Sequence, residues 1–247
     1  VLTNSETHVK KIIFHPKVLP SIVICDPELT VGMPKHITAG TGLDAFAHCV
    51  EAFSSPHYHP MSQGIALEGM RLVIDYLPRA YADGNDIEAR AQLMSAAAMG
   101  ATAFQKGLGA IHAMSHPIGA VFNTHHGTTN AVCMPAVLDL NEPEIRERFD
   151  RAAGYLGIDG GYDGFRAFVQ ELAVGVQAQK KRDVEAERAG GNGGNGLAIV
   201  IAHAHDRAFT KLTLNLTQSS RKCLFLVVVH YESSLAWRGR WRPTRGG

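Results

Sequence analysis

The residues best suited to chemistry lie in the segment 109–130, GAIHAMSHPIGAVFNTHHGTTN. Four of the chain's thirteen histidines fall within fifteen residues of this segment. They are His112, His116, His125 and His126. Upstream, Asp44 and His48 lie four residues apart in GTGLDAFAHCVEA, a spacing that places both side chains on one face of a helix. One carboxylate and several imidazoles suit Fe(II) or Zn(II), whereas Mg²⁺ or Ca²⁺ would need more oxygen ligands.

Each part of this pattern also has a plainer interpretation. An Asp-x-x-x-His pair occurs on many helices as a surface ion pair, and His116 could be a hydrogen-bonded core histidine. His125 could be a solvated neighbour of His126. HAMSH has the spacing of metalloprotease helices, but Ala113 stands where those enzymes keep a general-base Glu, which disfavours a zinc protease. The joint occurrence of the donors favours a metal site.

Helices are needed to hold these donors. Apolar residues recur at helical period from Thr38 to Phe53, with Thr41 as the predicted cap. Further helices are predicted over 61–75, 132–140, 143–156 and 165–176, and Pro117 is expected to start a helix or to kink one. The segment 86–104 is rich in Ala and Met, and we predict it to be the central helix of a bundle.

The two ends of the chain differ from this helical middle. Residues 1–26 contain three short extended pieces, VLTN, KKIIF and SIVICD, so the chain is expected to begin inside a larger structure. Residues 178–247 carry twelve Lys or Arg against five Asp or Glu, a glycine-rich run, and the apolar runs LAIVIA and CLFLVVV. We predict a basic tail that is disordered or aberrant, because a nucleic-acid arm this short would have no partner fold.

Composition excludes several classes of protein. The formal net charge of +1 and the 45% hydrophobic content are typical of a soluble globular protein and predict no nucleic-acid or membrane partner. The four cysteines lie far apart without a CxxC spacing, which predicts reduced thiols and a cytoplasmic location.

Four segments resemble the iron-containing alcohol dehydrogenase family, within the dehydroquinate synthase-like superfamily. They are DPELTVGMP, AGTGLDAFAHCVEA, AFQKGLGAIHAMSHPIGA and NTHHGTTNAVCMP, and the likeness runs from residue 1 to about residue 176. The resemblance implies that Asp44, His48, His112 and His126 are the metal ligands. It further implies that His116 lines the active site as a catalytic candidate for proton relay, and that Lys10 lies near the bound nucleotide.

The resemblance also sets the expected fold and domains. We expect a mainly α fold, with a multi-helix metal-binding domain over 36–177 after a short β remnant of an α/β nucleotide-binding domain over 1–35. The family's glycine-rich GGGS loop is absent, and residues 178–247 match nothing in the family. The 247-residue chain is therefore expected to bind metal weakly and to show no dehydrogenase turnover by itself.

The activity implied is that of an oxidoreductase that converts an alcohol to an aldehyde or ketone. Its cofactors would be Fe(II), with Zn(II) possible, and NAD or NADP in the complete enzyme. Its partner would be a small alcohol or aldehyde, and the complete enzyme is expected to be a homo-oligomer. Two alternatives remain open: a non-redox metal-dependent lyase of the same superfamily, and a catalytically inactive metal-binding or dimerisation fragment.

Overall fold

The computed structural model describes residues 2–4, 10–11, 13, 15–18, 20–173, 199–200, 212–218 and 221–227. The chain divides into two compact units, residues 1–185 and 186–247. The first unit is built mainly from helices, as the sequence predicts. Its long helices are α1 (Lys35–Ser54), α2 (Pro60–Ala82), α3 (Ile87–Ala103), α4 (Ala110–Phe122) and α5 (His126–Tyr155), and a last described helix covers 161–173.

Short elements accompany these helices. Three 3-10 turns span Pro16–Val18, Pro27–Thr30 and Phe104–Lys106. The two-residue strands β1 (Leu2–Thr3) and β2 (Lys10–Lys11) pair antiparallel. Among the described residues, no helix is both long enough and apolar enough to cross a membrane.

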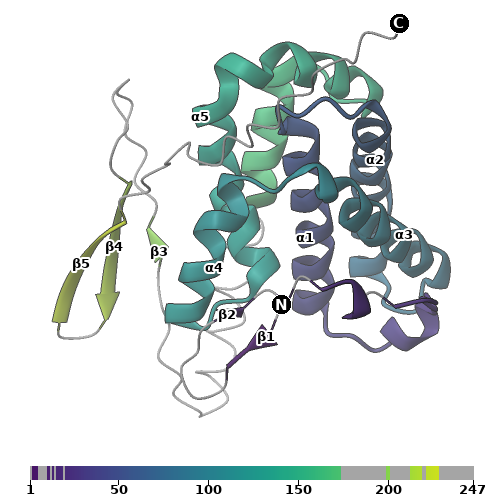
Figure 1. Cartoon of the computed structure of the whole chain (residues 1–247), viewed down its shortest axis with the longest axis horizontal. Coiled ribbons are helices and arrows are strands. Elements are labelled where there is room, and N and C mark those ends of the chain that lie inside the picture. The colour runs from purple at the N-terminus through teal and green to yellow at the C-terminus, as the bar shows by residue number, and fades with distance from the viewer. Residues whose placement is uncertain are drawn as a thin grey trace, which may run out of the picture. The chain divides into compact units, whose positions relative to one another are not determined.

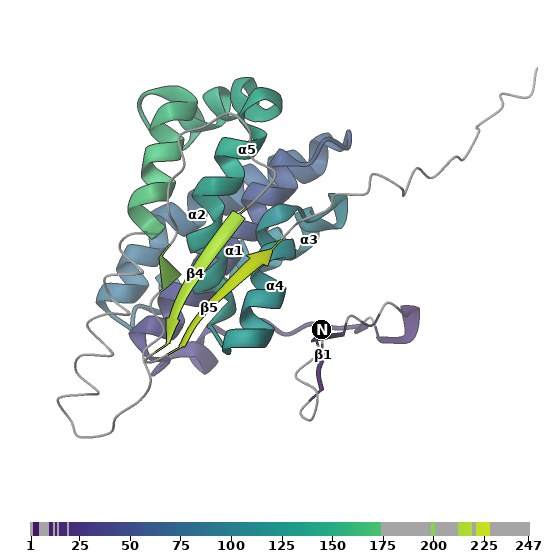
Figure 2. The same ribbon diagram turned by 90° about the vertical axis from the view of Figure 1, so that its left-hand side faces the viewer.

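Helix α1 is the central helix of the first unit. Figure 1 shows it between α4 and α5 on one side and α2 and α3 on the other, and it contacts α2, α3 and α5. In Figure 2, turned by 90°, α5 runs alongside α1. Apolar residues are buried around the whole circumference of α1, where Phe46, Ala47 and Cys49 have no exposed surface. A helix that is apolar on all sides belongs in the middle of a core.

The prediction that the helix near 86–104 is central is therefore wrong. The buried apolar residues of α3 are the small Ala89, Ala96, Gly100 and Ala103, and its opposite side is exposed. Small residues permit close approach, since a Cβ on Gly100 would lie only 3.0 Å from the Cβ of His48. They contribute little apolar volume, so α3 covers α1 instead of forming the core.

Several predicted boundaries also change. Helix α1 begins at Lys35, directly after Pro34, so Thr41 lies inside it and donates to the Ile37 carbonyl at 2.9 Å instead of capping. Residues 21–26, predicted as a strand, have no regular structure, and the side chains of Ile22 and Ile24 are exposed there.

Pro117 and Pro143 lie inside helices and do not begin new ones. Helix α4 continues through Pro117, and the helices predicted over 132–140 and 143–156 form the single helix α5, which contains Pro135 and Pro143. Each proline removes one backbone hydrogen bond but keeps a helical φ. The buried apolar face of α5 holds the helix together across these positions.

The second unit contains a three-stranded antiparallel sheet. Its strands β3 (Ile199–Val200), β4 (Leu212–Gln218) and β5 (Arg221–Val227) lie in the order β3-β4-β5. In the β4–β5 register Asn215 faces Leu224. Most of the predicted basic tail, including its glycine-rich run, lies outside the described residues.

Candidate metal centre

Helix α1 supplies two donors to one cluster. Asp44 and His48 lie four residues apart, so both face the same side of the helix, and Asp44 Oδ1 is 3.9 Å from His48 Nε2. Both side chains are partly buried, with 26% and 20% of their surface exposed. The cluster is thus covered by protein yet reachable from solvent.

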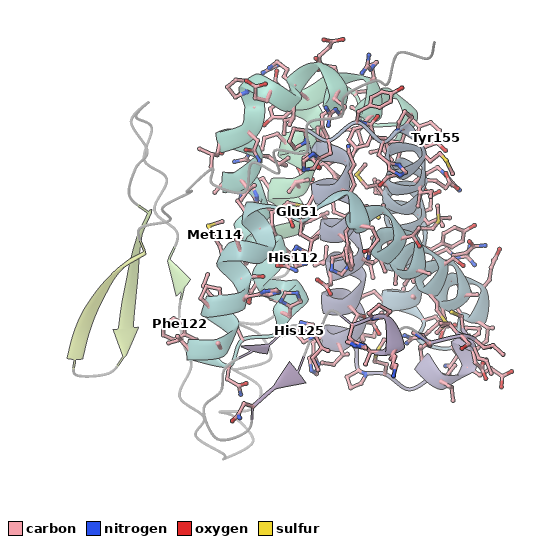
Figure 3. The ribbon with its side chains drawn as sticks, in the orientation of Figure 1. Glu51, His112, Met114, Phe122, His125 and Tyr155 are labelled. Carbon is pink, nitrogen blue, oxygen red and sulfur yellow. The ribbon has the colours of Figure 1, made fainter. Side chains whose placement is uncertain are left out.

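Helix α4 supplies His112. Its ring is held by Glu51 of α1, a residue that was not predicted from the sequence. His112 Nε2 lies 3.6 Å from Asp44 Oδ1, while His112 Nδ1 lies 2.5 Å from Glu51 Oε2. The other oxygen of Glu51 accepts the backbone N–H of Ile111 at 2.7 Å. Figure 3 shows Glu51 and His112 side by side. Glu51 therefore both caps the start of α4 and fixes the imidazole so that Nε2 faces Asp44.

Helix α5 supplies His126, its first residue. His126 Nε2 lies 3.4 Å from Asp44 Oδ1. Gly127 makes this approach possible, because a Cβ at Gly127 would lie 1.8 Å from the Gly40 carbonyl oxygen. Glycine is thus needed here for close contact between α5 and α1.

His125 points elsewhere, although it is adjacent to His126. Its ring packs against Gly40, where an added Cβ would lie 2.3 Å from the ring carbon Cε1. Its Nδ1 accepts the backbone N–H of Thr128 at 3.4 Å and so caps α5. The structure therefore gives the two adjacent histidines different tasks, one at the cluster and one at the helix terminus.

The spacing of the donor atoms fits a single cation. Two donors bonded to one ion at about 2.1 Å with tetrahedral angles lie about 3.4 Å apart. The distances from Asp44 Oδ1 to the three imidazole nitrogens are 3.4, 3.6 and 3.9 Å. The donor atoms of Asp44, His48 and His112 all lie within 4.8 Å of one another. A carboxylate with three imidazoles is a suitable donor set for Fe(II) or Zn(II).

Electrostatics keep the carboxylate charged. Burial acts to raise the pKa of Asp44, but the hydrogen bond from His112 and the neighbouring imidazoles outweigh it, so the pKa lies below its ordinary value of 3.8. Burial lowers the pKa of His48, since the charge of Asp44 compensates only in part. His48 is therefore neutral near pH 7, as a metal ligand must be.

The pKa of His112 shifts upward, in the opposite direction to that of His48. Burial disfavours its charged form, but hydrogen bonds and charges from Asp44 and Glu51 outweigh this and raise the pKa of His112 to about 9. The metal-free cluster therefore holds a proton on His112 near neutral pH. A cation that binds there must displace that proton.

The other predicted residues fall into two groups. His116 lies one turn after His112 on α4, partly exposed, with its ring 5.2 Å from that of His126 and 5.9 Å from that of His112, centroid to centroid. The backbone of Lys10 lies in β2, but the prediction concerns its side chain, which is outside the described part of the chain.

Two residues at the cluster were missed by sequence reasoning. Glu51 lies three residues after His48, and Asn130 lies four residues after His126. Both spacings place the side chain on the same helix face as a predicted ligand, and this signal was present in the sequence.

Comparisons with known proteins agree with this geometry. A model of the C-terminal part of the Fe-containing alcohol dehydrogenase family matches residues 38–188. The 4-hydroxybutyrate dehydrogenase of Cupriavidus necator is 49% identical over 138 residues, which cover 53% of this chain and 36% of that protein. An NAD-dependent methanol dehydrogenase of Bacillus methanolicus is 40% identical over 158 residues, covering 64% and 42%.

A solved structure shares the fold as well as the sequence pattern. The iron-containing alcohol dehydrogenase of Thermococcus thioreducens matches with a TM-score of 0.61 and 32% identity, over 66% of this chain and 43% of that chain. The chain spans less than half the length of these relatives. The family match covers more than half of the chain and includes all four predicted ligands, so the chain belongs to the Fe-containing alcohol dehydrogenase family.

Proposed function

We propose that this chain is the metal-binding part of an alcohol dehydrogenase that interconverts an alcohol and an aldehyde or ketone with NAD or NADP. The observation that carries the proposal is the convergence of Asp44 with imidazoles from α1, α4 and α5 at the spacing of ligands around one ion. The names of the relatives, a 4-hydroxybutyrate dehydrogenase and a methanol dehydrogenase, support this kind of reaction.

The proposed roles of the residues follow from their places. Asp44, His48, His112 and His126 would hold Fe(II) or Zn(II), and a cation there would supply the positive charge that polarises the oxygen of the alcohol. Glu51 orients His112 from behind. His116 is partly exposed beside the cluster, so it is placed to pass a proton between the site and solvent.

The domain assignment gives metal binding and nucleotide binding to different parts of the enzyme. We assign residues 36–177 to the metal-binding domain and residues 1–35, with Lys10, to the connection with a nucleotide-binding domain. Small alcohols or aldehydes would be the substrates, and the complete enzyme would be a cytoplasmic homo-oligomer. The free thiols of Cys25, Cys49 and Cys133 are compatible with a reducing compartment.

A fusion experiment tests this function. The N-terminal part of the Bacillus methanolicus relative would be joined in front of residue 1, and oxidation of methanol, 1,3-propanediol and 4-hydroxybutyrate would be measured with NAD and NADP. We expect turnover that needs added Fe(II) or Zn(II) and that is abolished by Asp44→Ala. The unfused chain should bind metal without turnover.

The outcome also separates the alternatives. A fusion that binds both the metal and NAD but oxidises none of the alcohols would contradict the dehydrogenase proposal. It would favour an inactive metal-binding module. If the fused protein instead catalysed a metal-dependent elimination reaction, the lyase alternative would be favoured.

A further inference from the structure

Asn130 lies at the centre of the proposed metal centre, although it is not among the predicted ligands. It follows His126 by one helical turn on α5, so both side chains face the same way. Its side chain is fully buried. Its amide nitrogen Nδ2 lies 2.7 Å from Asp44 Oδ1, 3.1 Å from His112 Nε2 and 3.2 Å from His126 Nε2. One amide group therefore contacts donors from all three helices that build the cluster.

The NH₂ group and the oxygen of this amide differ in their hydrogen bonding. The NH₂ group donates to Asp44 Oδ1 and also lies near the Nε2 atoms of His112 and His126, whereas Oδ1 is buried and has no hydrogen-bond partner among the described residues. A buried acceptor without a partner is unfavourable, so such an arrangement needs a compensating interaction at the other end of the same group.

The orientation of the amide follows from its contact with Asp44. If the amide were turned by 180°, its oxygen would occupy the present place of Nδ2, close to Asp44 Oδ1. Two acceptors would then face each other without a proton between them. The NH₂ group must therefore point toward Asp44 in the metal-free chain, even though this leaves Oδ1 unsatisfied.

A hydrogen bond in this place controls which way the carboxylate faces. A carboxylate has two oxygens and rotates freely about its last bond, so a ligand carboxylate needs an outer partner to hold one oxygen toward the ion. Asp44 Oδ1 is the atom that faces all three imidazoles and also the atom that accepts from Asn130. An oxygen that accepts one such bond still has lone pairs for a cation.

We propose that Asn130 is a positioning residue of the metal centre, whose amide N–H holds Asp44 Oδ1 in the orientation that binds the cation. Asn130 acts through Asp44 in the same way that Glu51 acts through His112. This inference rests on the proposed metal site, and it adds a residue that the metal would not need to touch.

The test measures metal binding, not activity, on the full 247-residue chain with Co²⁺ as the probe. Affinity comes from calorimetric titration, and the visible spectrum reports the coordination number, because four-coordinate Co²⁺ absorbs far more strongly than six-coordinate Co²⁺. We expect Asn130→Ala to weaken Co²⁺ binding about 10- to 100-fold, as loss of an outer-shell partner does elsewhere. The visible absorption of the bound ion should fall as well.

The control is the neighbouring residue. Thr129→Val changes a buried polar side chain of the same helix that bonds to Thr124 and to the His125 carbonyl but to none of the proposed ligands, and it should leave the Co²⁺ spectrum unchanged. If Asn130→Ala does not fold, Asn130→Asp keeps the shape but removes the donor, and it too should change the spectrum.

The outcomes separate the two proposals. If the wild-type chain binds no Co²⁺, the metal site itself is wrong. If the wild type binds Co²⁺ and a folded Asn130 variant binds it with the same affinity and spectrum, the metal site stands and the positioning role of Asn130 is overturned.

Discussion

Replacement of Gly127 by alanine should damage the metal centre through the backbone. A Cβ at this position would lie 1.8 Å from the Gly40 carbonyl oxygen and 3.0 Å from the Cβ of Asp44. Real Cβ contacts do not fall below 3.0 Å, so α5 and α1 must separate locally by at least 1.2 Å, the difference between 3.0 and 1.8 Å. Metal–ligand bonds tolerate deviations of only about 0.2 Å. His126 would therefore move several times farther from Asp44 than a shared ion allows.

Two magnitudes follow from this displacement. Overpacking of this kind costs about 1–3 kcal/mol, so the free energy of unfolding of Gly127→Ala in urea should fall by that amount. Metal affinity, measured by calorimetric titration with Zn²⁺, should fall at least about tenfold, the lower end of the effect of losing an outer-shell partner.

Gly154 provides a matched control in the same helix. A Cβ at Gly154 would meet nothing within 4 Å, so Gly154→Ala should leave metal affinity unchanged and raise stability by up to about 1 kcal/mol. If Gly127→Ala binds Zn²⁺ as tightly as Gly154→Ala does, the close helix contact is not what places His126, and the reasoning fails.

Three further predictions concern the imidazoles. His126→Ala should lose far more metal affinity than His125→Ala, because His126 Nε2 faces Asp44 while His125 caps α5; equal losses in parallel titrations would contradict this assignment. Zn²⁺ affinity should rise about tenfold per pH unit between about pH 6.5 and 8.5, because the pKa of His112 is raised to about 9 and its proton must leave before Nε2 can bind. The stability of the metal-free chain should show the opposite trend in a pH series of urea unfolding: a pKa above the unfolded value of about 6.5 stabilises the fold fully below that value, and this contribution is lost as the pH rises through about 9. A pH-independent Zn²⁺ affinity would show that His112 holds no proton in the free site.

Local spacing was enough to predict part of the fold and of the site. Asp44 and His48 are placed on one helix face by their separation alone. Helix α3 begins one residue after its predicted start, where Asp86 accepts the backbone N–H of Ala89 as the N-cap, and it ends one residue before its predicted end. The mainly α character also followed from periodicity. These features depend on interactions within about four residues of each other, which a sequence displays directly.

Features that depend on distant residues were not predictable in this way. Glu51 acquires its role only because Ile111 and His112 lie against it in the fold, some sixty positions later in the chain. The central position of α1 likewise depends on which helices cover it, and the Ala-rich composition of α3 was a misleading signal. Pro143 stands where a separate helix is predicted to begin, but packing of α5 against α1 outweighs one lost backbone hydrogen bond.

X-ray absorption of the Zn²⁺-loaded chain would show whether Asp44 and three imidazoles hold one divalent cation. We predict one Zn²⁺ per chain with nitrogen and oxygen ligands at about 2.0 to 2.2 Å, a strong multiple-scattering signature of imidazole, and no sulfur ligand. In His112→Ala the imidazole signature should weaken, and stoichiometric binding should be lost at protein concentrations that saturate the wild type. A spectrum with sulfur ligands, or one without imidazole, would contradict a site built from Asp44 and three imidazoles.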